Sequence, residues 1–261
     1  MTSRANLLSP SDGPPVEVVN PEGRGDVVLV CEHAANRIPA ALGTLGLDEA
    51  QLRTHIAWDP GAAAVARHIS AAMDAPLVLA RFSRLVYDCN RPPAAPGAMP
   101  SRSEIHVIPG NADLGECERR ARVEEIYLPF RRRVSGLLDQ RRAAGRRSVL
   151  VTVHSFTPVY AGTTREVDLG ILHDADSRLA DELIRIEERR GDLVVRRNAP
   201  YGPLDGVTHT LEEHALARGL LNAMLEIRND LIEDAASREA MAARLSRLIA
   251  AALSSWGCSD V

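Results

Sequence analysis

Short apolar runs separated by longer helical patterns dominate the chain and indicate an α/β sheet. Two of these runs, residues 26–31 (DVVLVC) and 148–153 (SVLVTV), are almost entirely apolar, which is typical of central strands covered on both faces. We expect further strands at residues 77–80, 85–88, 167–172, 193–196 and 220–227. The pattern therefore predicts a sheet whose middle strands are buried on both sides.

The stretches between the strands carry the period of amphipathic helices. We expect helices at residues 59–73, 113–144, 177–190 and 237–253, with a kink or a fresh start near Pro129. Asp59, followed by Pro60, is a natural N-cap for the first of them. These helices supply the cover that the buried strands require.

Two segments interrupt this alternation. Residues 1–20 are polar and contain prolines, so we expect a flexible leader with little structure of its own. Residues 92–104 hold four prolines and are not expected to form regular structure. A loop of this length is usually either functional, such as a lid, or disordered.

Residues 21–261 are predicted to form a single α/β domain, because a chain of this size fits one large domain better than two small ones.

Composition and charge narrow the partners. The net charge is −4, so there is no electrostatic case for binding nucleic acid or an anionic membrane, and 3% aromatic residues leave few stacking platforms. The four cysteines form no CxxC pair, which indicates neither a disulfide framework nor a thiolate zinc site. No signal peptide or membrane-spanning run is recognisable. We expect a cytoplasmic protein acting on a small molecule, with the oligomeric state left open.

Polar motifs follow the most apolar predicted strands. His33 lies in EHAAN (32–36), His154 begins HSF (154–156) and Glu226 begins EIRND (226–230). In open α/β sheets, ligands bind at the carboxyl ends of the strands. A histidine at a strand end is often only a hydrogen-bonded structural residue, but two of them with a glutamate favour a metal site. Zinc takes imidazole and carboxylate ligands and leaves one position open to water.

A fourth motif places Arg84 shortly before Asp88-Cys89-Asn90-Arg91. If this segment is a strand, alternation puts Asp88 and Asn90 on one face. Arg84 and Arg91 would then supply forked donors for a substrate carboxylate. The alternative is a surface cluster of salt bridges.

Together these motifs resemble the zinc carboxypeptidase and aspartoacylase superfamily, and within it the N-formylglutamate amidohydrolase family. The family hallmarks, in order over most of the chain, are read here as CEHAANRIP (31–39), HIAWDPGA (55–62), SRLVYDCNRP (83–92), NAPYG (198–202) and LEIRNDL (225–231). The resemblance implies a three-layer α/β sandwich of the zinc-carboxypeptidase type, with a mixed, mostly parallel central sheet. It also implies a zinc-dependent amidohydrolase that cleaves an N-acyl amino acid such as N-formyl-L-glutamate.

The resemblance implies one zinc ion per chain, with His33 and His154 as ligands. The chain departs from the HxxE motif of the peptidases, because Asn36 stands where the second ligand would be. Glu32 is adjacent, but in an extended strand its side chain points away from that of His33. We favour Asp59, whose helix should begin at the same sheet edge. The alternative role for Asp59 is plain N-capping.

The remaining roles also follow from the resemblance. Glu226 would be the general base, and Arg84 or the zinc would stabilise the oxyanion. Arg91 and Asn90 would bind the α-carboxylate of the substrate. Tyr201 would close over the substrate, or else be a packed loop residue.

His209 and His214 are expected to be helix-start and surface residues.

Two further functions stay open at this point. One is hydrolysis of another N-acyl amino acid or a short peptide, and the other is a catalytically silent, carboxylate-binding protein on the same scaffold, suggested by Asn36.

Overall fold

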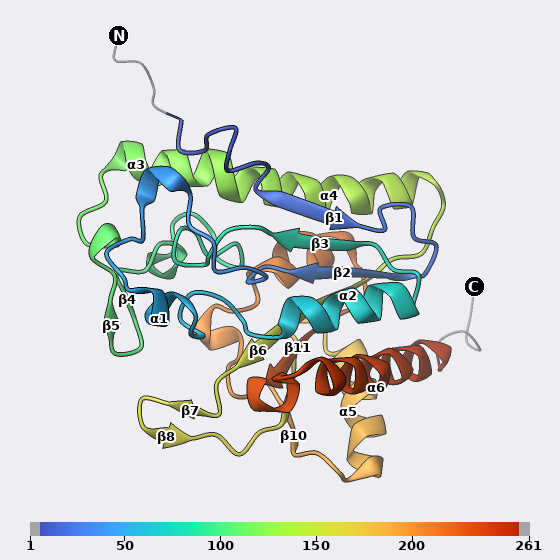
Figure 1. Cartoon of the computed structure of the whole chain (residues 1–261). Helices are drawn as coiled ribbons and strands as arrows, with labels where there is room; N and C mark the ends of the chain where they lie inside the picture. Colours follow the sequence, from blue (N-terminus) through green and yellow to red (C-terminus); the bar gives the residue numbers. More distant parts are fainter. Residues whose placement is uncertain (1–5, 256–261) are drawn as a thin grey trace.

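The computed structural model describes residues 6–255 and has helices and strands in alternation along the chain (Figure 1). The strands are β1 (Val16–Val19), β2 (Val27–Cys31), β3 (Leu77–Ala80), β4 (Arg102–Ser103), β5 (His106–Val107), β6 (Val149–Phe156), β7 (Val159–Tyr160), β8 (Thr163–Thr164), β9 (Leu169–Leu172), β10 (Val195–Arg197) and β11 (Asn222–Arg228). The α-helices are α1 (Glu49–Leu52), α2 (Ala62–Ala72), α3 (Glu116–Arg122), α4 (Leu128–Ala143), α5 (Arg178–Arg190) and α6 (Ala235–Ser254).

Seven strands form one central sheet in the order β1-β3-β2-β6-β11-β9-β10. Four neighbouring strands, β3, β2, β6 and β11, run parallel to one another. Strand β1 pairs antiparallel with β3, and β9 pairs antiparallel with β11. The predicted α/β class with a mixed, mostly parallel sheet is therefore confirmed, and the carboxyl ends of β2, β6 and β11 lie at one edge.

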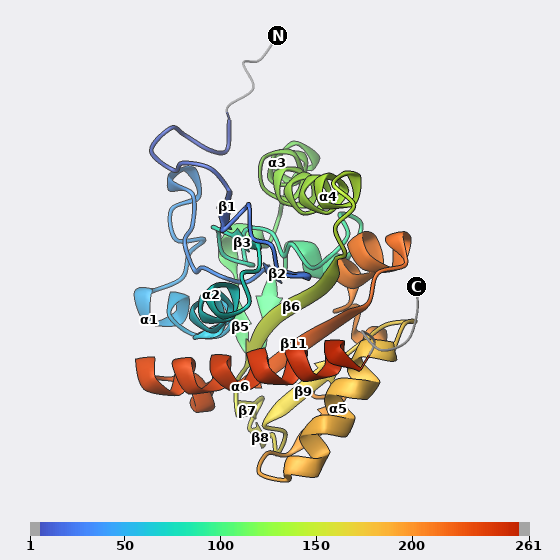
Figure 2. The same cartoon turned by 90° about the vertical axis from the view of Figure 1, so that its right-hand side faces the viewer.

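Helices cover both faces of this sheet (Figure 2). Helices α2, α5 and α6 pack on one face, and α4 with the segments around it packs on the other. Burial on both faces explains why the sequence of β2 is apolar throughout. Val27, Leu29 and Cys31 belong to the first core cluster, whereas Val28 and Val30 belong to the second. Alternating side chains of one strand thus enter two separate cores.

The N-terminal segment differs from the expected unstructured leader. Val16–Val19 forms the edge strand β1, with Val16 opposite Ala80 and Val19 opposite Leu77 of β3. Val16 and Val18 pack against the core on the α4 face, so their alternation with Glu17 is the two-residue period of a half-buried strand. The prediction is wrong for these residues, and its part that falls on residues 1–5 lies outside the described residues.

The predicted strand at residues 85–88 is also wrong. This segment is a turn, in which the carbonyl of Ser83 accepts from Val86 N at 2.9 Å and Ser83 Oγ accepts from Leu85 N at 3.1 Å. Leu85 and Val86 are fully buried. Their apolar character therefore reflects core packing without strand pairing, and the alternation argument for Asp88 and Asn90 does not apply.

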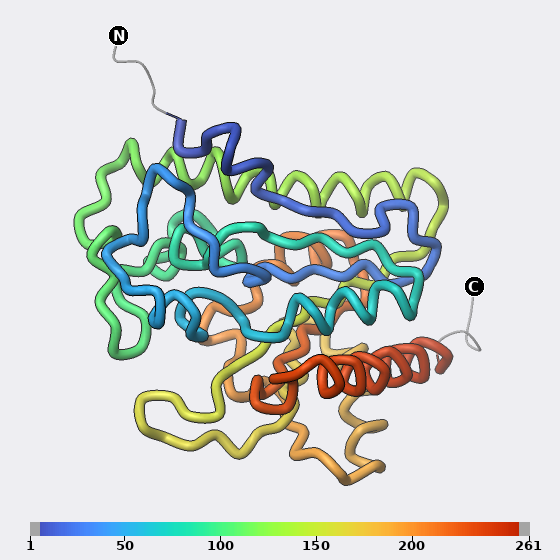
Figure 3. Tube along the Cα trace, viewed as in Figure 1, coloured from blue at the N-terminus to red at the C-terminus, as the bar shows by residue number. Residues whose placement is uncertain are grey.

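The long arginine-rich stretch is helical with an irregular centre. Helix α3 passes through a π-helical turn at Val123–Tyr127 into α4, and Pro129 lies in the first turn of α4. The backbone keeps right-handed helical angles on both sides of this junction, so the chain continues in the same direction past Pro129 (Figure 3). No helix within residues 6–255 is both long enough and apolar enough to cross a membrane.

Candidate functional site

Two histidines meet at the carboxyl edge of the sheet. His33 follows β2, and His154 lies in the last part of β6. Their Nδ1 atoms are 3.2 Å apart, and both side chains are buried. Glu226 stands directly beside His154, because the two residues are register partners on the parallel strands β11 and β6. The parallel pairing of three strands thus brings together the residues predicted from their strand ends.

Asp59 completes this cluster. Its Oδ2 atom lies 3.2 Å from Nδ1 of His33 and 2.8 Å from Nδ1 of His154, and it also accepts from Ser155 N at 3.3 Å. One ligand atom from each of the three residues lies within 4.8 Å of the other two. Two imidazole nitrogens and one carboxylate oxygen converging in a buried site fit the donor set that zinc prefers.

The same geometry bears on the alternatives for the third ligand. Asp59 does not cap a helix, because α2 begins only after Gly61, which is its N-cap in a left-handed conformation with φ 83°. A Cβ at Gly61 would lie 2.7 Å from the Ile232 side chain, so the turn that presents Asp59 requires glycine. Asn36 donates to the carbonyl of Leu52 at 2.9 Å, which gives this amide a structural role.

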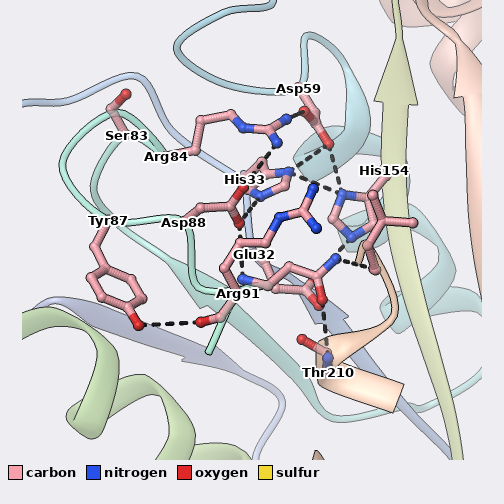
Figure 4. A network of polar contacts seen from close by, with 12 residues as sticks. Glu32, His33, Asp59, Ser83, Arg84, Tyr87, Asp88, Arg91, His154 and Thr210 are labelled. Atoms are coloured by element: carbon pink, nitrogen blue, oxygen red, sulfur yellow. Dashed lines mark hydrogen bonds and ion pairs between the residues drawn. The ribbon is translucent and has the colours of Figure 1, made fainter. Parts of the chain in front are cut away.

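Each histidine has a second carboxylate on its other ring nitrogen (Figure 4). Nε2 of His33 lies 2.7 Å from Oδ1 of Asp88, and Nε2 of His154 lies 3.1 Å from Oε2 of Glu32. Such outer partners fix the rotation of a metal-binding imidazole and turn its free nitrogen toward the metal. Glu32 and His33 lie in a turn after β2 rather than in an extended strand, and the Glu32 carboxylate lies beside the other histidine.

The surrounding carboxylates make the cluster favour positive charge. Burial opposes protonation of His154, yet the charges of Glu32 and Asp59 and their hydrogen bonds raise its pKa well above the ordinary value. The pKa of Asp88 is held far below its usual range, against the effect of burial, by the charges of His33 and Arg84. A site that takes up protons where the two Nδ1 atoms meet is also a site that attracts a cation, which displaces those protons on binding.

Arg84 joins the two carboxylates on the open side of the cluster. Its Nη2 donates to Oδ2 of Asp88 at 2.9 Å, and its Nη1 lies 3.5 Å from Oδ1 of Asp59. The side chain is 30% exposed, whereas those of its two partners are buried. Arg84 therefore presents a fixed guanidinium at the wall of the cavity, as a group that stabilises developing negative charge must.

Glu226 has an unusual environment for a carboxylate. Its Oε2 is buried and has no hydrogen-bond partner among the described residues. Burial raises the pKa of Glu226 to about 7; His154 opposes this rise and Asp59 adds to it. A carboxyl group with a pKa near neutrality exchanges protons readily at physiological pH, which suits a general base.

These side chains line one cavity of about 370 Å³, within the range of small-molecule sites. Arg91 and Asn90 line it as well. The Asn90 amide is already engaged, because Nδ2 donates to the Val207 carbonyl at 2.5 Å and Oδ1 accepts from Thr210 N at 3.0 Å. Arg91 donates to the Asp205 carbonyl through Nη1. Both residues thus anchor the segment around residues 205–210 beside the cavity.

Tyr201 also lines the cavity, and it belongs to an aromatic group around Arg165. The guanidinium carbon of Arg165 lies 4.8 Å from the ring centre of Tyr201, 4.6 Å from that of Tyr160 and 5.7 Å from that of Phe156. Arg165 follows the hairpin formed by β7 and β8. The sequence did not indicate this cluster around Arg165, because the aromatic partners come from three separate segments.

Glu104 ties together three segments at the cavity rim. Its Oε1 accepts from Ala161 N at 2.7 Å, and its Oε2 lies 3.1 Å from Nε2 of His55. These contacts link the β4–β5 hairpin to the β7–β8 hairpin and to the turn before α2. The proline-rich loop 92–104 is therefore partly ordered: it contains strand β4 and a 3₁₀ turn, Pro96–Ala98.

The two histidines of the segment THTLEEHA, His209 and His214, lie outside the cavity. His209 Nε2 is 2.8 Å from the Tyr127 hydroxyl. His214 is buried and its Nδ1 lies 3.1 Å from Ser135 Oγ, so the expectation of a surface position is wrong for His214. It lies in the irregular helical segment Leu211–Ala215, which packs against β6 and β11.

The fold and the site define an α/β protein with a candidate metal centre of two histidines and one aspartate at the carboxyl edge of its sheet. The chain belongs to the N-formylglutamate amidohydrolase family, whose model matches residues 25–233, a range that includes all the predicted site residues. The proteins of this family are named as amide hydrolases.

Several chains of solved structures resemble this chain. A gene product of Agrobacterium tumefaciens is 57% identical, with a TM-score of 0.94 over 96% of this chain and 99% of that one. The N-formylglutamate amidohydrolase from Ralstonia eutropha is 21% identical, with a TM-score of 0.63 over 90% of this chain and 95% of that one. At that identity the likeness supports the fold. No curated protein matches the chain.

Proposed function

We propose that the chain is a zinc-dependent amidohydrolase that cleaves the linear amide bond of an N-acyl amino acid such as N-formyl-L-glutamate. The observation that carries the proposal is the convergence of His33 Nδ1, His154 Nδ1 and Asp59 Oδ2 in the cavity that Glu226 also lines. The sheet order, with this cluster at the carboxyl edge, supports the proposed kinship with the zinc carboxypeptidases.

When bound by His33, Asp59 and His154, zinc would polarise the scissile carbonyl and lower the pKa of a water molecule there. Glu226 accepts the proton that the attacking water loses as its oxygen bonds to the carbonyl carbon. It then gives this proton to the amine nitrogen as the carbon–nitrogen bond breaks. The products are the free amino acid and the carboxylic acid of the acyl group.

Four further side chains account for the rest of the proposed reaction. Arg84 stabilises the negative oxygen of the tetrahedral intermediate, because Asp59 and Asp88 hold its guanidinium in place. Arg91 binds the α-carboxylate of the substrate, and Asn90 shapes that part of the cavity through its bonds to Val207 and Thr210. Tyr201 covers the bound substrate from the rim.

The proposed setting is the cytoplasm. Cys31, Cys89 and Cys117 are all free thiols, which suits a reducing compartment. The proposed partner is the small-molecule substrate, with no nucleic acid and no membrane.

Metal content and turnover test the proposal together. Purified protein should contain about one zinc per chain, as a site with three protein ligands predicts, and should release formate from N-formyl-L-glutamate. The H154A variant should lose both zinc and activity, whereas H68A, which removes an exposed histidine of α2, should keep both. Full activity in metal-free protein would contradict the zinc dependence. Other N-acyl amino acids and short peptides in the same assay define the acyl group.

A further inference from the structure

A second cavity lies at the opposite edge of the sheet from His154. Its volume is about 310 Å³, at the lower end of the range of small-molecule sites. It is lined by Val149, the first residue of β6, and by Leu221, the residue before β11. Because β6 and β11 run parallel, this cavity is at their amino ends and is separate from the candidate metal centre.

Four arginines and no acidic residue line this cavity. They are Arg142, Arg146, Arg147 and Arg218. Arg218 is neutralised by Asp139, with Nη2 and Oδ1 3.1 Å apart. Within residues 6–255, the guanidinium groups of Arg142 and Arg147 have neither a hydrogen-bonded nor an ionic partner. The lining therefore carries uncompensated positive charge.

The side chain of Arg141 holds in place the turn that carries these arginines. Arg141 is buried and donates to the carbonyls of Gly23 at 2.9 Å and Arg147 at 3.0 Å, and to Ser148 Oγ at 3.0 Å. This one side chain ties the turn between α4 and β6 to the segment before β2. Arg142 and Arg147 are not needed for that purpose, and fixed backbone positions reduce the entropy that their ordering on a ligand would cost.

Apart from Ser148, the rest of the lining is apolar. Leu138, Leu220 and Leu221 contribute side chains, and Gly219 borders open space, with no heavy atom within 4 Å of the position a Cβ would take. A bare inorganic anion would leave these apolar groups unused. The cavity thus fits a ligand with a multiply charged anionic end and an uncharged, partly apolar body.

We propose that this cavity binds a nucleoside diphosphate. Guanidinium groups form paired, charge-assisted hydrogen bonds with phosphate oxygens, and the two unpaired guanidinium groups of Arg142 and Arg147 match the charge of a diphosphate better than that of a single carboxylate. The base and sugar would lie against the leucines. The net charge of −4 for the whole chain opposes general attraction of polyanions, so binding would depend on this local arrangement. The inference does not depend on the proposed amidohydrolase activity.

Calorimetric titration of the full chain with ADP, pyrophosphate, inorganic phosphate and adenosine tests this proposal. ADP should bind tightest, pyrophosphate more weakly, and inorganic phosphate and adenosine weakest. The R142Q/R147Q variant keeps the length of both side chains and should weaken ADP binding by about tenfold or more, since two charge-assisted contacts are lost. The R132Q/R133Q variant removes the same charge from exposed positions of α4 outside the cavity and should change the affinity by less than about twofold.

Three results would overturn the proposal. One is the absence of ADP binding, and another is equal weakening in the two double variants, which would indicate attraction by overall charge alone. The third is unchanged binding in R142Q/R147Q, which would place the anion elsewhere, for example beside Arg84 and Arg91. Circular dichroism and melting temperature check that both variants fold as the unmodified chain does.

Discussion

Nε2 of His33 lies 2.7 Å from Oδ1 of Asp88, and this contact turns Nδ1 of the same ring toward Asp59 and His154. The D88N variant should therefore bind zinc about 10–100-fold more weakly, because the imidazole loses the partner that fixes its tautomer and rotation. Competition with a chelating dye measures the affinity. D113N, at an exposed position, is the matched control. Equal zinc affinity in D88N and the unmodified chain would show that Asp88 does not orient the ligand.

The E226Q variant should keep its zinc and lose turnover by about 10²–10⁴-fold, since an amide has no site to accept the proton of the attacking water. Formate release and metal analysis on the same sample separate catalysis from metal binding. E239Q, an exposed position on α6, should behave as the unmodified chain does. Turnover in E226Q near that of the control would remove Glu226 from its proposed role.

Buried His214 should make stability depend on pH. Burial lowers the pKa of His214 to about 4, from 6.5 for an exposed histidine. Between these values the unfolded chain binds a proton that the folded chain does not, so the free energy of unfolding falls as the pH drops from 6.5 toward 4. The full contribution of this residue is on the order of 3 kcal/mol.

Urea unfolding at several pH values, with and without His214, isolates this contribution. The H214Q variant should show a shallower loss of stability than the unmodified chain over the same window, and H68Q should show the same loss. Parallel curves for H214Q and the unmodified chain would mean that other groups carry the acid sensitivity.

Removing the Glu104 carboxylate should loosen the cavity rim. The E104A variant loses the bond from Ala161 N and the contact with His55, worth about 1 kcal/mol in binding. We expect KM for N-formyl-L-glutamate to rise about fivefold with kcat changed little. E104Q keeps an acceptor for Ala161 N, so its KM should lie between those of E104A and the unmodified chain. E188A, at an exposed position, is the control. A fall in kcat at unchanged KM would place Glu104 in the chemistry instead of the rim.

The central residues of the site could be predicted because their positions follow from strand burial. Strands β2, β6 and β11 are continuous apolar runs, and such runs in parallel order bring their carboxyl ends to one edge. His33, His154 and Glu226 then had to be neighbours. Asp59 followed from the return of the chain to the same edge, although the helix it was expected to cap begins three residues later, at Ala62.

Other parts of the site could not be predicted for physical reasons. The pairing of Asp88 with His33 and of Glu32 with His154 depends on ring rotation, which no spacing encodes. Leu85, Val86 and Tyr87 are apolar because they fill the core. Their sequence therefore resembles that of a buried strand, although they pair with no other strand. Arg165 and Glu104 reach their partners across loops that have no periodic pattern.

The order of synthesis and the order of the sheet differ in one place that matters. Strand β11 is the last to be made, yet it lies between β6 and β9. A growing chain that has already produced His33, Asp59 and His154 therefore has a gap in its sheet, with two unpaired strand edges. The same insertion that closes this gap delivers Glu226 beside His154. The three proposed metal ligands are therefore synthesised before the proposed general base, and the site gains Glu226 only when β11 enters the sheet.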